Sequence, residues 1–291
     1  MLYTRVLTAI CTLPLLAAFL AYAPGVWVLA FFVLCLGLSL WEIIDMIYPR
    51  LLAIAASTAN KSNSQAKVAW ANVSFGMIGT FWFCYADEIS KHLPVVGLIS
   101  LGATVFFFAF VFLEQDLAKA MVGLLTSLLA LAYCLPPWLA IWHLYQLKSQ
   151  AYFVFLLLFI VMANDSGAYF GGRFFGGKIF GQRKLSPRLS PKKTIEGAVV
   201  GLVSGVIAAI TIATLWGQNP FSLLSLAFTA MIVGIVSILG DLVESYFKRF
   251  AQVKDSGKVL PGHGGFLDRV DGIMFGASAL YALLLLFEQK L

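Results

Sequence analysis

Long apolar runs alternate with short polar segments along the whole of this 291-residue chain. A helix needs about 20 apolar residues to cross the hydrocarbon of a bilayer, where lipid offers backbone polar groups no other partner. Runs of this length predict about nine transmembrane helices, and therefore an all-α, polytopic integral membrane protein. The predicted spans are 6–22, 26–44, 69–86, 93–113, 118–142, 151–170, 196–216, 222–247 and 270–287.

The spans divide the chain into two regions. Residues 1–150 form an N-terminal region of about five spans, and residues 151–291 form a C-terminal region that we expect to be catalytic. The C-terminal region contains two hydrophilic loops, 171–195 and 248–269. The first span is also compatible with a cleaved signal peptide, because Arg5 precedes the apolar run and small residues follow it.

Composition supports the membrane interpretation. Hydrophobic residues make up 60% of the chain, charged residues only 12%, and the mean hydropathy is +0.90. An ordinary soluble domain carries about 25% charged residues. With nine spans, 17 of the 20 Lys and Arg fall on one side of the membrane. Short loops rich in Lys and Arg stay in the cytoplasm, so this asymmetry predicts that loops 171–195 and 248–269 are cytoplasmic.

Acidic residues also gather around these two loops. Membrane topology explains the basic residues there but does not require acidic ones. The acids in question are Asp165, Glu196, Asp241, Glu244, Asp255, Asp268 and Asp271. An unpaired charge at the membrane edge costs several kcal/mol, so each of the membrane-edge acids needs a partner. For Asp241, that partner is either Lys248, which lies on the same helical face, or a metal ion.

Asp268 and Asp271 stand three residues apart at the start of the last span, near the N-terminal end of a helix. A capping role explains one such acid well but two less well. Carboxylates converging from the ends of the last two spans, among Lys and Arg, suit a magnesium-dependent nucleotide site. The sequence therefore predicts Asp241, Asp268 and Asp271 as Mg2+ ligands.

Glycine-rich and basic segments flank these acids. The segment "PGHGG" and the five glycines between Gly171 and Gly181 expose N–H groups that can cradle phosphate. Ser190 followed by Pro191 predicts a helix cap, which would place Lys192 and Lys193 in the first turn of the next helix, where phosphate binds. Both lysines are also compatible with anchoring to the membrane surface.

With these residues in view, the sequence resembles the phosphatidate cytidylyltransferases, or CDP-diacylglycerol synthases. The C-terminal motif of that family is "SYFKRFAQVKDSGKVLPGHGGFLDRVD" here, from Ser245 to Asp271, with every fixed position filled. The segments "LGDLVES", "ANDSGAY" and "KLSPRLSPKKTIEG" extend the resemblance over about residues 160 to 287. One departure is Ile195, where the family usually has Trp.

The resemblance implies transfer of CMP from CTP to phosphatidic acid, which gives CDP-diacylglycerol and pyrophosphate in phospholipid biosynthesis. It implies Mg2+, a second, K+-like ion and a homodimer. It supports the three aspartates as metal ligands and implies that Lys248 is a catalytic cation beside the nucleotide phosphates. The short chain with little soluble appendage favours a bacterial inner membrane, with an organelle membrane as the alternative. The predicted substrate-binding residues are Asp165, Ser190, Lys192, Lys193, Arg249, Lys254, His263, Gly264, Gly265 and Arg269.

Three other interpretations stay open at this point. A CDP-alcohol phosphotransferase shares the opening of "DRVDG", but its later Asp-x-x-x-Asp is missing here. A transporter would explain intramembrane acids, although these acids lie at one end of the spans. A catalytically silent homologue of the synthases would keep the motif without the reaction.

Overall fold

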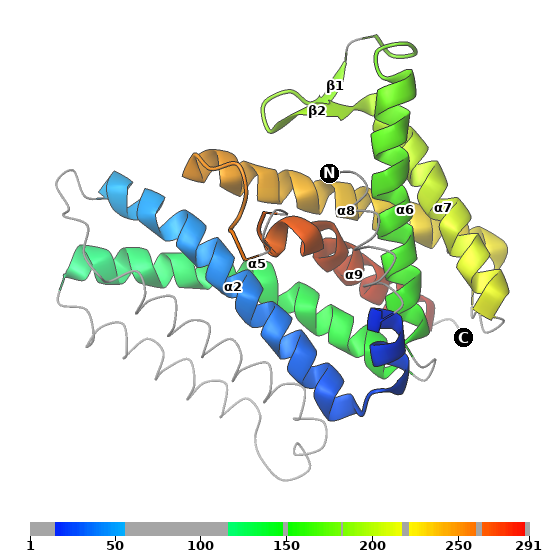
Figure 1. The fold of residues 1–291 in the computed structure, drawn as a ribbon, viewed down its shortest axis with the longest axis horizontal. Helices are drawn as coiled ribbons and strands as arrows, with labels where there is room; N and C mark the ends of the chain where they lie inside the picture. Colours follow the sequence, from blue (N-terminus) through cyan, green and yellow to red (C-terminus); the bar gives the residue numbers. More distant parts are fainter. Residues whose placement is uncertain are drawn as a thin grey trace.

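The computed structural model describes residues 15–55, 116–147, 151–181, 183–216, 221–259 and 264–288. Six long helices dominate these ranges (Figure 1). They are α2 (Gly25–Ala55), α5 (Leu117–Gln146), α6 (Tyr152–Phe175), α7 (Ile195–Trp216), α8 (Leu223–Ala251) and α9 (Leu267–Glu288). By length and composition each could cross a membrane, and each overlaps one predicted span. The predicted spans 69–86 and 93–113, and most of 6–22, lie outside the described residues, so the total of nine stays a prediction.

A small β-hairpin interrupts the helical architecture between α6 and α7. Strand β1 (Lys184–Ser186) pairs antiparallel with β2 (Ser190–Thr194). The predicted cap at Ser190 is therefore wrong, as is the placement of Lys192 and Lys193 in a helical turn. The residue before a proline is pushed toward extended backbone, and a two-stranded ribbon tolerates proline because both strands are edges. The cap of α7 is Thr194, whose Oγ1 accepts a hydrogen bond from the N–H of Gly197 at 3.1 Å.

Helices α6 and α7 form a close antiparallel pair that supports the hairpin. Small residues line their interface: a Cβ added to Gly201 of α7 would lie 2.6 Å from the backbone oxygen of Asn164 in α6. Only glycine permits this approach of the two backbones. The hairpin is thereby fixed at the end of the pair, on the side where α8 passes (Figure 1).

Helices α2 and α5 pack against each other and contact α8 and α9. Aromatic side chains make part of this contact, with the rings of Trp138 in α5 and Phe266 before α9 stacked at 6.3 Å between centroids. Trp138 also donates from Nε1 to Ser39 Oγ of α2 at 3.1 Å. This packing brings α2, from the N-terminal region, next to the start of α9.

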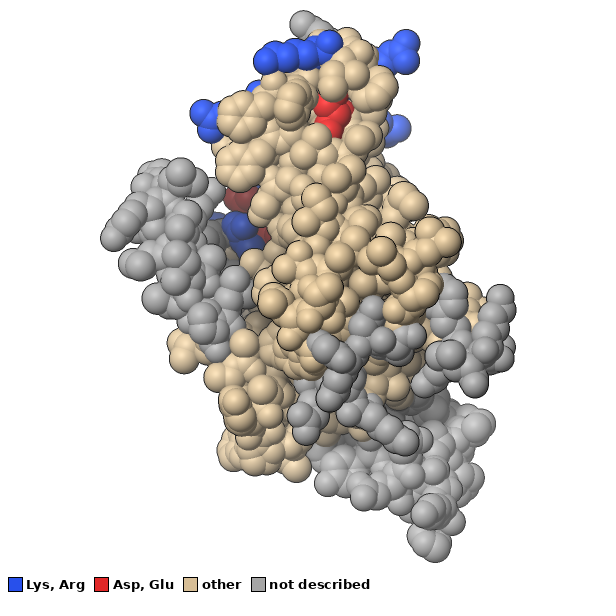
Figure 2. Space-filling model, turned by 90° about the vertical axis from the view of Figure 1, so that its right-hand side faces the viewer, with Lys and Arg blue, Asp and Glu red and all other residues tan. Residues whose placement is uncertain are grey.

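Charge is segregated on the surface (Figure 2). Lys and Arg side chains gather at one end of the face shown, and further acidic and basic side chains appear inside a recess below them. One acidic group lies near the basic ones, and below them, apart from the recess, the described surface of this face is uncharged. An uncharged band under a basic end is the distribution expected for a protein that lies in a bilayer.

Candidate active site

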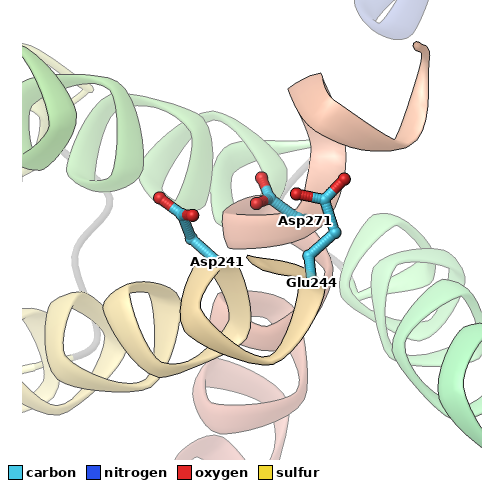
Figure 3. Close-up of side chains that lie close together, drawn as sticks. All are labelled: Asp241, Glu244 and Asp271. Atoms are coloured by element: carbon cyan, nitrogen blue, oxygen red, sulfur yellow. The ribbon is translucent and has the colours of Figure 1, made fainter. Parts of the chain in front are cut away.

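Three carboxylates from two helices converge at one point (Figure 3). Asp241 and Glu244 lie three residues apart on α8 and so share a face, and Asp271 comes from the second turn of α9. One oxygen from each carboxylate lies within 4.8 Å of the others. We call Asp241, Glu244 and Asp271 the acid triad.

The acid triad has the donor set of a hard cation. Glu244 is fully buried, and its Oε1 has no hydrogen-bond partner among the described residues. A buried carboxylate without partners is costly, and neighbouring carboxylates add repulsion. Mg2+ prefers oxygen ligands and is usually held by one or two carboxylates together with substrate phosphates. The residues therefore fit the predicted metal, with Glu244 as a member that the sequence did not single out.

Two lysines neutralise part of this charge. Lys193 of the β-hairpin forms an ion pair with Asp241, and Lys248 forms one with Glu244. Lys248 also lies 2.6 Å from Asp268 Oδ1. The alternative in which Lys248 neutralises Asp241 is thus wrong, because the cation beside Asp241 comes from a different loop.

Asp268 lies beside the acid triad and has its own partners. Its Oδ2 accepts hydrogen bonds from the N–H groups of Ser256 and Gly265, both at 2.9 Å, while Oδ1 faces Lys248. These contacts fix the loop after α8 to the first turn of α9. The role of Asp268 as a metal ligand stays a prediction, since in this arrangement both of its oxygens are engaged.

Glu42 of α2 completes the anchoring of this loop and was missed from the sequence. Its Oε2 accepts from Ser256 Oγ and from the N–H of Leu267, and its Oε1 accepts from the N–H of Phe266, all at 2.8 Å. The carboxylate therefore occupies the N-terminal end of α9. An acid inside the apolar run 26–44, near its C-terminal end, was the available indication, because such residues are rare without a role.

Two cavities that share Lys192 lie beside the acid triad: one is lined by Lys248, the ion-pair partner of Glu244, and the other by Asp241. The first, about 390 Å³, is strongly basic, and we call it the basic cavity. Its lining includes Ser190, Lys192, Lys248, Arg249, Lys254, Asp268 and Arg269. The second, about 490 Å³, has a more apolar lining and lies between α6, α7 and the hairpin; we call it the α6–α7 cavity. Its lining includes Asp165, Tyr169, Lys192, Lys193, Ile238 and Asp241.

Most predicted substrate-binding residues are thus brought together, with Lys192 shared by the two cavities. Arg249 is held in place through Nε, which donates to the backbone oxygen of Leu189 at 3.4 Å. Gly264 has a φ of +83°, a conformation that favours glycine, and Gly265 donates to Asp268 as described. His263 lies outside the described residues.

Comparison with known proteins identifies the family of this chain and several relatives. A family model described as "Cytidylyltransferase family" matches residues 3–287. A phosphatidate cytidylyltransferase of Helicobacter pylori is 43% identical over 134 residues, which are 45% of this chain and 47% of that protein. One of Bacillus subtilis is 40% identical over 139 residues, 47% of this chain and 48% of that protein.

The uncharacterized protein YnbB of Escherichia coli is 36% identical over 159 residues, which are 55% of this chain and 50% of that protein. The aligned segment of this chain thus spans about half the length of each of these relatives.

Proposed function

This chain belongs to the cytidylyltransferase family, and we propose that it is a CTP-dependent phosphatidate cytidylyltransferase that makes CDP-diacylglycerol. The observation that carries the proposal is the acid triad, with Lys193 and Lys248 beside it and a basic cavity next to it. A site of this kind suits the transfer of CMP from one polyanionic substrate to another. The names of the relatives from H. pylori and B. subtilis support phosphatidate as the acceptor.

Asp241, Glu244 and Asp271 would hold Mg2+. A bound Mg2+ would supply positive charge to phosphate oxygens and would hold them close together. Asp268 would act beside the acid triad, because it positions Lys248 and the loop after α8. We retain it as a further candidate ligand. A second, K+-like ion and a homodimer stay predictions.

The chemistry is one in-line displacement. A phosphate oxygen of phosphatidic acid forms a bond to the α phosphorus of CTP, the bond from that phosphorus to the bridging oxygen breaks, and pyrophosphate leaves. A phosphate monoester has a second pKa of about 6, so the attacking oxygen is already anionic and needs no strong base. The protein's task is to position the reactants and to neutralise their charge.

The two cavities divide this task. The basic cavity suits the triphosphate, because Lys192, Lys248, Arg249, Lys254 and Arg269 outnumber the acids there. The α6–α7 cavity suits the phosphate end of phosphatidic acid, because Lys193 lies beside apolar side chains such as Tyr169 and Ile238. Lys192 borders both cavities, where the two substrates would meet.

We propose a bacterial inner membrane with the acid triad at its cytoplasmic edge. The six apolar helices and the bacterial relatives support the membrane location, and the basic loops support the orientation. CTP would then enter from the cytoplasm, and the lipid from the bilayer.

The decisive experiment uses the full chain, purified in mixed micelles containing phosphatidic acid. Pyrophosphate release and CDP-diacylglycerol formation are measured with CTP and Mg2+, and each component is omitted in turn. Formation of both products only when all three are present is the expected result. Folded protein that forms neither product would contradict the proposal and would favour a silent homologue or a transporter.

A further inference from the structure

A third cavity, of about 910 Å³, lies between the second half of α2 and the segment that follows α8. We call it the α2 cavity. It shares Lys254 and Asp255 with the basic cavity, so the two adjoin. None of the sequence motifs pointed to its α2 side, which Trp41, Asp45 and Arg50 contribute.

The α2 cavity differs in charge from the basic cavity. The basic cavity has five Lys or Arg against two acids, Asp255 and Asp268. The α2 cavity has three basic residues, Arg50, Lys254 and Lys258, against three acids, Glu42, Asp45 and Asp255, together with apolar side chains. A lining of balanced charge does not attract a triphosphate. It suits an uncharged group that carries hydrogen-bond donors and acceptors.

Two polar groups in this cavity lack partners within the described part of the chain. Arg50 Nε is buried and has no hydrogen-bond partner among the described residues. Asp45 is exposed in the cavity, one turn after Glu42, and forms none of the hydrogen bonds or ion pairs found among the described residues. An unpaired buried donor is costly, so a bound group with an acceptor would relieve it.

We propose that the α2 cavity binds the nucleoside of CTP, and that Asp45 and Arg50 recognise the cytosine base. This inference rests on the proposed function, which puts the triphosphate in the basic cavity. Cytosine presents its 4-amino group as a donor, which a carboxylate accepts, and has ring nitrogen and carbonyl acceptors for Arg50. Uracil has a carbonyl at position 4, which the Asp45 carboxylate would repel. The cavity would therefore select CTP over UTP.

The first test compares kcat/KM for CTP and UTP in wild type and in Asp45→Asn. The asparagine amide can donate to uracil, so we expect the CTP/UTP ratio to fall about 10- to 100-fold. Asp116→Asn is the matched control, because Asp116 is an exposed acid that lines none of the three cavities. An unchanged ratio in folded, active Asp45→Asn would overturn the inference and leave the proposed function intact.

The second test does not depend on the charged residues. Ala53 is an exposed residue of α2 in the same cavity, so a cysteine there should react with a maleimide. We expect CTP to slow the labelling of Ala53→Cys at least about 10-fold and UTP to have a much weaker effect, in keeping with the expected selectivity. Equal labelling with and without CTP would overturn the inference. If wild type forms no CDP-diacylglycerol, the proposed function fails, and this labelling alone decides whether the cavity binds the nucleotide.

Discussion

Glu42 and Glu244 are two buried glutamates in apolar helices, 1% and 0% exposed, and their surroundings are opposite. Both oxygens of Glu42 receive hydrogen bonds, from Ser256 Oγ and from two backbone N–H groups at the start of α9. Glu244 has Lys248 on one oxygen and, among the described residues, no hydrogen-bond partner for the other, and it lies beside two aspartates.

The difference separates a structural acid from a reactive one. The partners of Glu42 are uncharged donors at a helix N-terminus, where the helix dipole favours negative charge. The charge of this carboxylate is therefore stabilised without a cation. The acid triad, in contrast, needs a bound cation to balance its negative charge. Burial alone therefore does not identify a functional acid in this membrane protein; the number and charge of its partners do.

Removal of a carboxylate from the acid triad is the strongest test of the difference between Glu42 and the acid triad. Asp271→Asn keeps the shape of the side chain but loses a charge that the cation needs. We expect CDP-diacylglycerol formation to fall by about 10³-fold or more. The folding yield and melting temperature should stay at least as high as in wild type, because repulsion within the acid triad falls. Activity near wild type would contradict the assignment of Asp271 as a ligand.

The corresponding change at Glu42 should affect stability first. Glu42→Ala removes the acceptor of the N–H groups of Phe266 and Leu267, at the start of α9, and of Ser256 Oγ, at about 1–3 kcal/mol for each unsatisfied group. We expect the melting temperature in detergent to fall by about 5 °C or more. Glu42→Gln, which keeps one acceptor oxygen, should lie between wild type and Glu42→Ala. A melting temperature unchanged in Glu42→Ala would show that Glu42 does not hold α9.

The effect of Mg2+ on the melting temperature should also distinguish Glu244 from Glu42. Ligand binding to the folded state stabilises it by about 2.7 kcal/mol at 100 times Kd, so Mg2+ should raise the melting temperature of wild type by a few degrees. We expect Glu244→Gln to lose this increase and Glu42→Gln to keep it, although its starting value is lower. Measurement of thermal unfolding with and without EDTA checks both. The same increase in all three proteins would mean that the cation binds elsewhere.

The sequence could predict the acid triad in part. Asp241 and Asp271 follow from topology, since the end of one span and the start of the next lie at the same membrane edge. Glu244 shares the helical face of Asp241, but the sequence pattern favours Asp268, because it stands with Asp271 at the start of the last span. Asp268 stands three residues before Asp271, in the first turn of α9, where N–H groups of the preceding loop, from Ser256 and Gly265, hold it.

Glu42 could not be located from sequence, because its partners are more than 200 residues away and depend on how α2 packs against α9. The β-hairpin could not be predicted from the sequence for a different reason. Its strands have three and five residues, too short to show a period of two, and Ser190-Pro191 is equally typical of a helix start. The consequence is that Lys193 approaches Asp241 from a strand, not from a helix N-terminus.

Substitution of Lys193, which reaches Asp241 from strand β2, should have a smaller effect than the substitutions at Glu42 and in the acid triad. Lys193 is only partly buried, and its partner Asp241 also accepts a bond from Ser245 Oγ at 3.4 Å, so Lys193→Ala should fold normally. It removes a cation from the α6–α7 cavity, where we place the lipid phosphate. We expect KM for phosphatidic acid to rise about 10-fold, a loss typical of one charged hydrogen bond, with a smaller change in kcat. Lys184→Ala, in the paired strand but outside the lining of that cavity, is the control. Unchanged kinetics in Lys193→Ala would leave Lys193 only its role as a membrane anchor, and the lipid phosphate would have to bind through Lys192.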